Sequence, residues 1–118
     1  MKGLVFAANC PSRKILLTLT SRWSVLILVA LRDQRLRFNE LKKLIDGISE
    51  KMLAQTLKLL EQDGFIYRQD YFEVPHRVDY QLTDFGREAS DRLFDLTDWL
   101  ENNISQLLEQ QPRSDLVL

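Results

Sequence analysis

The chain has 118 residues and a mass of 13.9 kDa, a length that suits one compact domain able to bury a sizeable core. Apolar residues make up 45% and charged residues 28%, which excludes a disordered chain, and the longest apolar run, residues 25–31, is too short to span a bilayer. Cys10 is the single cysteine, which excludes an internal disulfide and a cysteine-ligated metal cluster and favours a cytoplasmic location.

The net charge of −1 conceals an uneven distribution of charge along the chain. Residues 1–60 carry eleven Lys or Arg and four Asp or Glu, giving +7, whereas residues 61–118 carry five against thirteen, giving −8. A half-chain this basic is typical of a surface that binds a polyanion such as nucleic acid. Ordinary solvated surface is the alternative, because a bias in composition does not define a site.

Three short helices are predicted in the first 47 residues. Pro11 can begin the first helix, and the second, nearly apolar and therefore central, runs from its cap Ser21 to about residue 31. Asn39 is the expected cap of the third helix, which Gly47 ends in a left-handed turn. The apolar side of the third helix comprises Leu41, Leu44 and Ile45.

A fourth helix has the clearest start and stop signals in the chain. Ser49 is its candidate cap, Ile48 can pack against Leu53 one turn inside, and the Asp-Gly pair at 63–64 closes it. One apolar stripe, with the spacing i, i+4 and i+7, consists of Leu53, Leu57 and Leu60. The opposite, outward face consists of Lys51, Gln55 and Lys58.

Residues 65–72 and 78–82 alternate as strands do, which predicts a β-hairpin. Its tip carries Pro75, His76 and Arg77. The hairpin is therefore a candidate wing beside the fourth helix.

A long final helix is predicted from the cap Thr83 to about Gln110, followed by a flexible tail at 111–118. Its apolar stripe comprises Phe85, Ala89, Leu93, Leu96, Leu100, Ile104 and Leu107. The stripe is wider than a domain core needs, so we expect dimerisation along part of this helix. The expected dimer residues are Leu96, Trp99, Leu100, Ile104 and Leu107. Packing of the stripe against its own subunit is the alternative.

This order of elements predicts a mainly α fold with a small β-hairpin, a winged helix-turn-helix with a body at 10–82 and a dimerisation helix at 83–110. In such a fold the second helix of the pair lies in the major groove, here residues 49–63. Glutamine can bind an adenine edge, and lysine can donate to guanine or phosphate, so base contacts are expected from the outward face of that helix. Two copies related by a two-fold axis would read half-sites about 34 Å apart.

Further DNA contacts are expected around the fourth helix. They come from Ser49 at its start, from Arg37, Asn39 and Lys42 on the preceding helix, and from His76 and Arg77 on the wing. An arginine at a wing tip can reach phosphates or the minor groove. The alternative for Arg77 is a structural salt bridge with Glu73 or Asp79.

Cys10 is a candidate redox-sensing thiol, because the dipole of the first helix and two cations in its first turn, Arg13 and Lys14, favour the thiolate. The alternative is a small buried hydrophobe at a subunit interface. No metal site, cofactor or enzymatic activity is expected, since His76 is the only histidine and no glycine-rich phosphate loop occurs.

Several short motifs follow one another along the chain. They are Cys10-Pro11, Arg22-Trp23-Ser24, the segments 37–41 and 47–53, Leu60-Glu61, Asp63-Gly64, and the segments 74–80 and 82–86. In combination they resemble the HxlR-type transcription regulators, winged-helix proteins related to the MarR group, over residues 10 to about 100. The resemblance implies a homodimer on palindromic promoter DNA, paired through the N-terminal segment and the last helix. It also implies an oxidant or electrophile response at Cys10 and, since the family commonly has proline where His76 stands, a less rigid wing tip.

The sequence therefore predicts a homodimeric repressor that binds double-stranded DNA, is not attached to a membrane, and can respond to a small-molecule or electrophile effector. Two alternatives stay open. One is a winged-helix module that binds proteins and not DNA, and the other is a thiol redox protein that acts through Cys10 alone.

Overall fold

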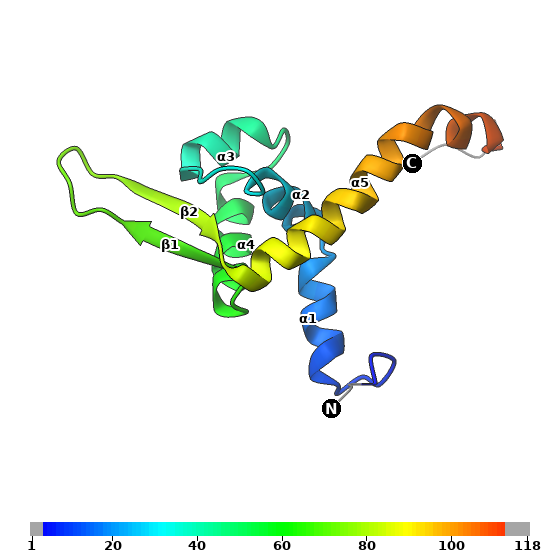
Figure 1. Cartoon of the computed structure of the whole chain (residues 1–118), viewed down its shortest axis with the longest axis horizontal. Helices are drawn as coiled ribbons and strands as arrows, with labels where there is room; N and C mark the ends of the chain where they lie inside the picture. The colour runs from blue at the N-terminus through cyan, green and yellow to red at the C-terminus, as the bar shows by residue number, and fades with distance from the viewer. Residues whose placement is uncertain (1–3, 113–118) are drawn as a thin grey trace.

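A computed structural model describes residues 4–112 and shows five helices and one two-stranded sheet (Figure 1). The elements are α1 (Pro11–Leu19), α2 (Arg22–Ala30), α3 (Phe38–Leu44), α4 (Glu50–Gln62), β1 (Ile66–Asp70), β2 (Val78–Leu82) and α5 (Asp84–Gln110). This arrangement confirms the mainly α winged helix-turn-helix. The hairpin projects from one side of the helical body, and the second half of α5 leaves it on the other side (Figure 1). Of the tail predicted at 111–118, residues 113–118 lie outside the described residues.

The core lies between α2, α3, α4 and the base of the hairpin. Its fully buried side chains include Ile27, Leu28, Leu41, Ile48, Leu53, Leu60 and Ile66. Burial of this apolar area, at roughly 25 cal/mol per Å², is the main term that holds the helices together. The structure thereby confirms α2 as the central helix.

The start of α3 differs from the prediction. Asn39 does not cap this helix, because Arg37 is the N-cap residue and the helix begins at Phe38. The reason is Glu40 in the first turn of α3. Its carboxylate accepts a hydrogen bond of 2.9 Å from the backbone N–H of Arg37 and so gives this unpaired N–H at the helix start a partner. On the apolar side Leu41 and Ile45 are buried, but Leu44 is exposed.

The boundaries of α4 follow the prediction. The Ser49 hydroxyl accepts a hydrogen bond from the backbone N–H of Met52 at 3.1 Å, and Ile48 and Leu53 are both buried beside this cap. The predicted stripe on α4 is buried along its whole length. Gly64, with a φ of 85°, supplies the left-handed turn that leads into β1. The packing of α4 on the core therefore involves only the side of the helix that carries the leucine stripe.

β1 and β2 pair antiparallel, with Ile66 opposite Leu82 and Asp70 opposite Val78, which confirms the hairpin. A third segment joins this sheet, because Leu36 pairs with Tyr80 through two backbone hydrogen bonds of 2.8 and 3.1 Å. The connection between α2 and α3 is thereby attached to β2.

The first two turns of α5 pack closely on the body. The Thr83 hydroxyl accepts a hydrogen bond from the N–H of Gly86 at 3.0 Å, which confirms the predicted cap. Gly86 and Ser90 are the two buried residues of α5, whereas Phe85, predicted in the stripe, is 73% exposed. A glycine is needed at position 86 because α5 lies there directly against the backbone of Phe65.

Candidate nucleic-acid interface

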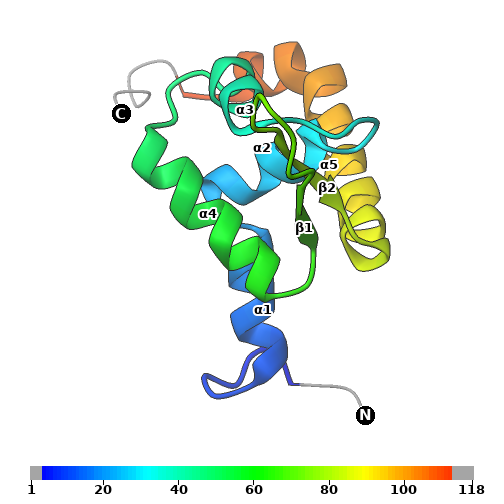
Figure 2. The same cartoon turned by 90° about the vertical axis from the view of Figure 1, so that its left-hand side faces the viewer.

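The outward face of α4 is the centre of the candidate interface. Lys51, Gln55 and Lys58 are all exposed, opposite the buried leucine stripe of the same helix. Figure 2 views the molecule from the side on which the hairpin projects, and in this view α4 lies in front, with the second half of α5 behind. The fold thus presents these three side chains to a partner. That they contact bases stays a prediction.

An apolar groove of about 360 Å³ adjoins Gln55 between α4 and the start of α2. It is lined by Ser21, Arg22, Trp23, Met52, Gln55, Thr56 and Leu59. Met52 and Leu59 are 39% and 51% exposed on the same helix, although sequence reasoning gave them no role. Apolar side chains next to a reading face can contact the methyl group of thymine.

The expected phosphate contacts from α3 lie near its start. Arg37 and Asn39 are exposed, whereas Lys42 is partly buried. Ser49 is exposed as well, but its hydroxyl oxygen already accepts the capping hydrogen bond of α4. The structure therefore leaves Arg37 and Asn39 more accessible than Lys42.

At the wing, His76 bonds to the protein itself. Its Nε2 lies 3.1 Å from Asp70 Oδ2, and the other carboxylate oxygen of Asp70 accepts from the N–H of Phe72 at 2.8 Å. The N–H of Phe72, followed by the ring of His76, holds the pKa of the Asp70 carboxyl below its usual value. The pair links the two sides of the hairpin loop.

Arg77 folds back along the hairpin. Its guanidinium lies 4.1 Å from the ring centre of Tyr71, and it forms ion pairs of 3.8 Å with Glu73 and with Asp79. This is the salt-bridge arrangement that sequence analysis held as the alternative to a wing-tip contact. A DNA contact from Arg77 would therefore start from the flank of the wing and not from its tip.

Arg35 and Asp79 were not predicted as site residues. Asp79 is only 2% exposed, and its Oδ2 lies 3.6 Å from Nε of Arg35 in addition to its pair with Arg77. Arg35 also donates a hydrogen bond to the hydroxyl of Tyr71 at 3.0 Å. The signal in the sequence was Leu36, an apolar residue between two arginines, which marks the extended segment that pairs with Tyr80.

These residues line a cleft of about 460 Å³ between the start of α3 and the hairpin. Its lining comprises Arg35, Arg37, Asn39, Glu40, Arg77 and Asp79. The cleft thus combines two of the predicted phosphate ligands of α3 with the wing arginine.

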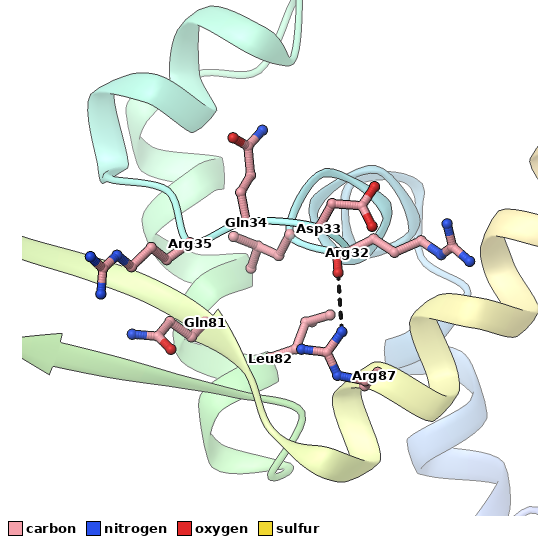
Figure 3. Close-up of a pocket in the computed structure, with 8 residues that line it drawn as sticks. Arg32, Asp33, Gln34, Arg35, Gln81, Leu82 and Arg87 are labelled. Atoms are coloured by element: carbon pink, nitrogen blue, oxygen red, sulfur yellow. Dashed lines mark hydrogen bonds between the residues drawn. The ribbon is translucent and has the colours of Figure 1, made fainter.

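A separate cavity of about 260 Å³ lies between the body and the first turns of α5 (Figure 3). Arg87 donates to the backbone oxygen of Arg32 at 3.3 Å across it, and Arg32 in turn pairs with Asp91 at 3.1 Å and lies over the ring of Phe94. Figure 3 shows Arg35 pointing away from these groups, toward the hairpin. Arg32 and Arg87 therefore attach α5, whereas Arg35 lines both this cavity and the neighbouring cleft and extends its guanidinium toward the cleft.

Two helices carry apolar side chains that this single chain does not cover. On α5 the predicted dimer residues Leu96, Trp99, Leu100 and Ile104 are 42–56% exposed, and Leu107 is partly buried. On α1 no residue is buried, and Ile15, Leu16 and Leu17 are 38–61% exposed. The second half of α5 therefore does not fold back onto its own subunit.

Cys10 is buried at the N-cap position of α1, directly before Pro11. Burial alone would raise the pKa of its thiol, but the backbone N–H groups of Arg13 and Ser12 outweigh this effect and lower the pKa below its ordinary value. The first turn of α1 thus favours the thiolate through its backbone N–H groups, whereas the predicted effect of the Arg13 and Lys14 charges is not among the causes.

Within residues 4–112, no helix is long and apolar enough to cross a membrane. In the same range, no group of three or more His, Cys, Asp or Glu side chains is arranged to hold a metal ion.

Comparison with known proteins gives a consistent picture. Residues 18–108 match the family described as HxlR-like helix-turn-helix. The HTH-type transcriptional regulator YtfH of Escherichia coli K12 is 51% identical over 107 residues, which cover 91% of this chain and 85% of the relative. The HTH-type transcriptional regulator YdeP of Bacillus subtilis is 39% identical over 93 residues, covering 79% and 73%.

Solved structures agree with these relatives. The transcriptional regulator ytfH of Salmonella typhimurium superposes with a TM-score of 0.87 at 53% identity, covering 95% of this chain and all of the other. The redox regulator HypR in its oxidised form gives a TM-score of 0.73 at 33% identity, covering 80% of this chain and 97% of that one. These similar proteins are named as regulators.

Proposed function

The chain belongs to the HxlR-like helix-turn-helix family of transcriptional regulators, and on that premise we propose that it is a homodimeric repressor that occupies a palindromic promoter site. Occupation of a promoter would block access of the polymerase. In this proposal the body at 10–82 binds DNA, and the helix at 83–110 pairs the two subunits.

The observation that carries this proposal is the two-sided character of α4. Its leucine stripe is buried, while Lys51, Gln55 and Lys58 are exposed on the opposite side beside a projecting hairpin. A helix fixed in this way can enter the major groove without losing packing in the core. Gln55 is assigned to an adenine edge, and the two lysines to guanine or phosphate.

The dimer is supported by the uncovered apolar surfaces of α1 and of the second half of α5. One recognition helix contacts only a few base pairs, too few to specify a promoter in a genome. Pairing two chains through these helices would bury leucines such as Leu16 and Leu100 and present two copies of α4. The spacing of the copies would then define an inverted repeat.

Selection of bound sequences from random duplex DNA tests the proposal. We expect an inverted repeat whose half-sites lie about one helical turn apart. A single unpaired motif would contradict the dimer. If the protein retained no duplex at all, it would instead be a winged-helix module that binds proteins.

We also propose that DNA binding responds to modification of Cys10. The lowered pKa of this thiol supports the proposal, as does the similarity to HypR, which is described as a redox regulator in oxidised and reduced forms. Modification at the N-cap of α1 would shift a helix of the proposed dimer interface and thereby the spacing of the two recognition helices.

A further inference from the structure

We propose that the cleft between α3 and the hairpin binds one phosphodiester of the DNA backbone in each half-site, with Arg35 as a ligand and the buried Asp79 as its positioning residue. The inference rests on the proposed DNA binding and assigns roles to two residues outside the predicted interface. Asp79 itself would not touch DNA.

Asp79 holds two arginines and a glutamine in fixed positions around its carboxylate. Its Oδ2 lies 3.6 Å from Arg35 and 3.8 Å from Arg77, and its Oδ1 accepts a hydrogen bond from Gln81 at 3.2 Å. The carboxylate is 2% exposed, while the side chains of the two arginines are 54% and 31% exposed. A buried anion thus holds two cations at the surface.

Tyr71 fixes the same two arginines from the hairpin. Its hydroxyl accepts a hydrogen bond from Arg35 at 3.0 Å, and its ring lies 4.1 Å from the guanidinium carbon of Arg77. Side chains held in this way lose little conformational freedom when a ligand binds, so the cleft is preorganised.

The contacts to Asp79 leave hydrogen-bond donors of the cleft unused. The distances of 3.6 and 3.8 Å to Asp79 are too long for hydrogen bonds, although the opposite charges attract. The Arg35 side chain is 54% exposed and donates one hydrogen bond, of 3.0 Å, to the hydroxyl of Tyr71. Its planar guanidinium therefore keeps further N–H donors for an acceptor that has at least two oxygens in one plane.

The charge of the cleft also suits a phosphodiester. The cleft is lined by three arginines and two carboxylates, and one of those carboxylates, Glu40, already accepts a hydrogen bond from the N–H of Arg37 at 2.9 Å. The lining residues alone carry an excess of one positive charge, equal in size to the single negative charge of a phosphodiester, and Glu73 outside the lining pairs with Arg77 at 3.8 Å. Asn39, also in the lining, can donate from its side-chain amide.

The position of the cleft points to DNA as the source of this phosphate. The cleft lies between α3, which directly precedes the proposed recognition helix, and the hairpin, which projects on the side seen in Figure 2. In a helix-turn-helix the first helix crosses the sugar-phosphate backbone while the second lies in the groove.

Binding of the selected operator duplex by full-length variants, measured over a series of salt concentrations, tests the inference. Arg35→Ala should lower affinity on the order of tenfold and reduce the slope of log K against log salt by about one for each half-site. Arg35→Lys keeps the charge but loses the planar fork, so it should recover only part of that affinity.

Asp79→Asn gives the sharper result. The substitution removes a negative charge, which by charge alone should strengthen DNA binding, but we expect it to weaken binding and to flatten the salt slope because the two arginines lose their positioning residue. Asp95→Asn is the matched control. It makes the same chemical change at an exposed position on α5, and we expect no loss of affinity. If Asp79→Asn does not fold, as thermal unfolding would show, the Arg35 variants alone decide the question, since Arg35 is a surface residue.

Neutral methylphosphonates placed one at a time along the operator identify the phosphate. One position in each half-site should weaken wild-type binding but have little further effect on Arg35→Ala, which a merely structural role would not produce. Additive effects at every position would overturn the inference. So would inhibition by inorganic phosphate beyond that by chloride at equal ionic strength, which would assign the cleft to a free anion.

Failure of the inference differs visibly from failure of the proposed function. If wild-type protein binds the operator but the Arg35 and Asp79 variants match Asp95→Asn, the cleft does not bind phosphate and the function stands. If wild-type protein binds no duplex DNA, both proposals are wrong.

Discussion

The hydroxyl of Ser90 on α5 donates a hydrogen bond of 2.7 Å to the backbone oxygen of Leu28 on α2, and both residues are fully buried. This bond joins the central helix of the body to the helix proposed to pair the subunits. The position of α5 on the body that carries α4 is therefore set by contacts within the single chain.

Gly86, one turn before Ser90, allows α5 to lie directly against the backbone of Phe65. Gly86→Ala should therefore destabilise the fold by about 3 kcal/mol or more. An added Cβ would lie 1.8 Å from the backbone oxygen of Phe65, which cannot move without shifting β1. Urea unfolding measures the effect. Gly64→Ala is the comparison, because nothing lies within 4 Å of its Cβ and only its φ of 85° opposes the substitution, at about 1 kcal/mol. Equal losses in the two variants would contradict the argument.

The sequence predicted those elements whose signals are local. The cap of α4 by Ser49 and the cap of α5 by Thr83 depend on residues within one turn of each helix start, and both are present. The leucine stripe of α4 follows from helical period alone. The exposed face of α4 opposite that stripe could therefore be located without coordinates.

Contacts between distant segments could not be predicted in this way. The alternation of a strand places Asp79 and Tyr80 on different faces of β2, with Asp79 on the solvent side. Asp79 is nevertheless buried, because Arg35 and Arg77 cover it. Arg35 reaches it only because Leu36 pairs with Tyr80. Similarly, Phe85 fits the helical stripe of α5, but the close approach of Phe65 at Gly86 turns that side chain outward.

Gln55→Ala should relax base preference at one position in each half-site, with a loss of discrimination of about 1–3 kcal/mol. The side chain is exposed on α4, so folding should be unaffected. Binding to a panel of operators with single base changes measures the discrimination, and Gln106→Ala on α5 is the matched control. An equal loss of specific and non-specific binding would remove Gln55 from the reading face.

Ile104→Asp should convert the proposed dimer to a monomer, because it places a charge on an apolar surface that is 42% exposed in the single chain. Analytical ultracentrifugation measures the mass, and operator affinity should fall along with it. Asn102→Asp adds the same charge on the opposite side of α5 and should leave the dimer intact. A dimer that persists in Ile104→Asp would place the interface elsewhere, with α1 as the next candidate.

The stability supplied by Asp70 should depend on pH. Its pKa is lower in the folded chain than in the unfolded chain, so the contribution is complete above the ordinary pKa of an aspartate, 3.8, and is lost as pH falls through the lower folded value. Thermal unfolding of wild type and Asp70→Asn should therefore differ at pH 6, and the difference should shrink as pH falls below 3.8. A difference that stays constant would show that the carboxylate charge plays no part.

The reactivity of Cys10 should reflect its lowered pKa. Iodoacetamide alkylates the thiol, replacing its proton with a carbon substituent and releasing iodide. The alkylation rate should rise with pH, and the midpoint of this rise should lie below the midpoint for free cysteine. Unmodified Cys10→Ser should bind the operator as the wild type does, since a hydroxyl at the N-cap of α1 preserves the helix start. After treatment, the wild type should lose affinity and Cys10→Ser should not. If alkylated wild type keeps its affinity, Cys10 is a packing residue, and if Cys10→Ser responds as strongly, the agent acts at another group.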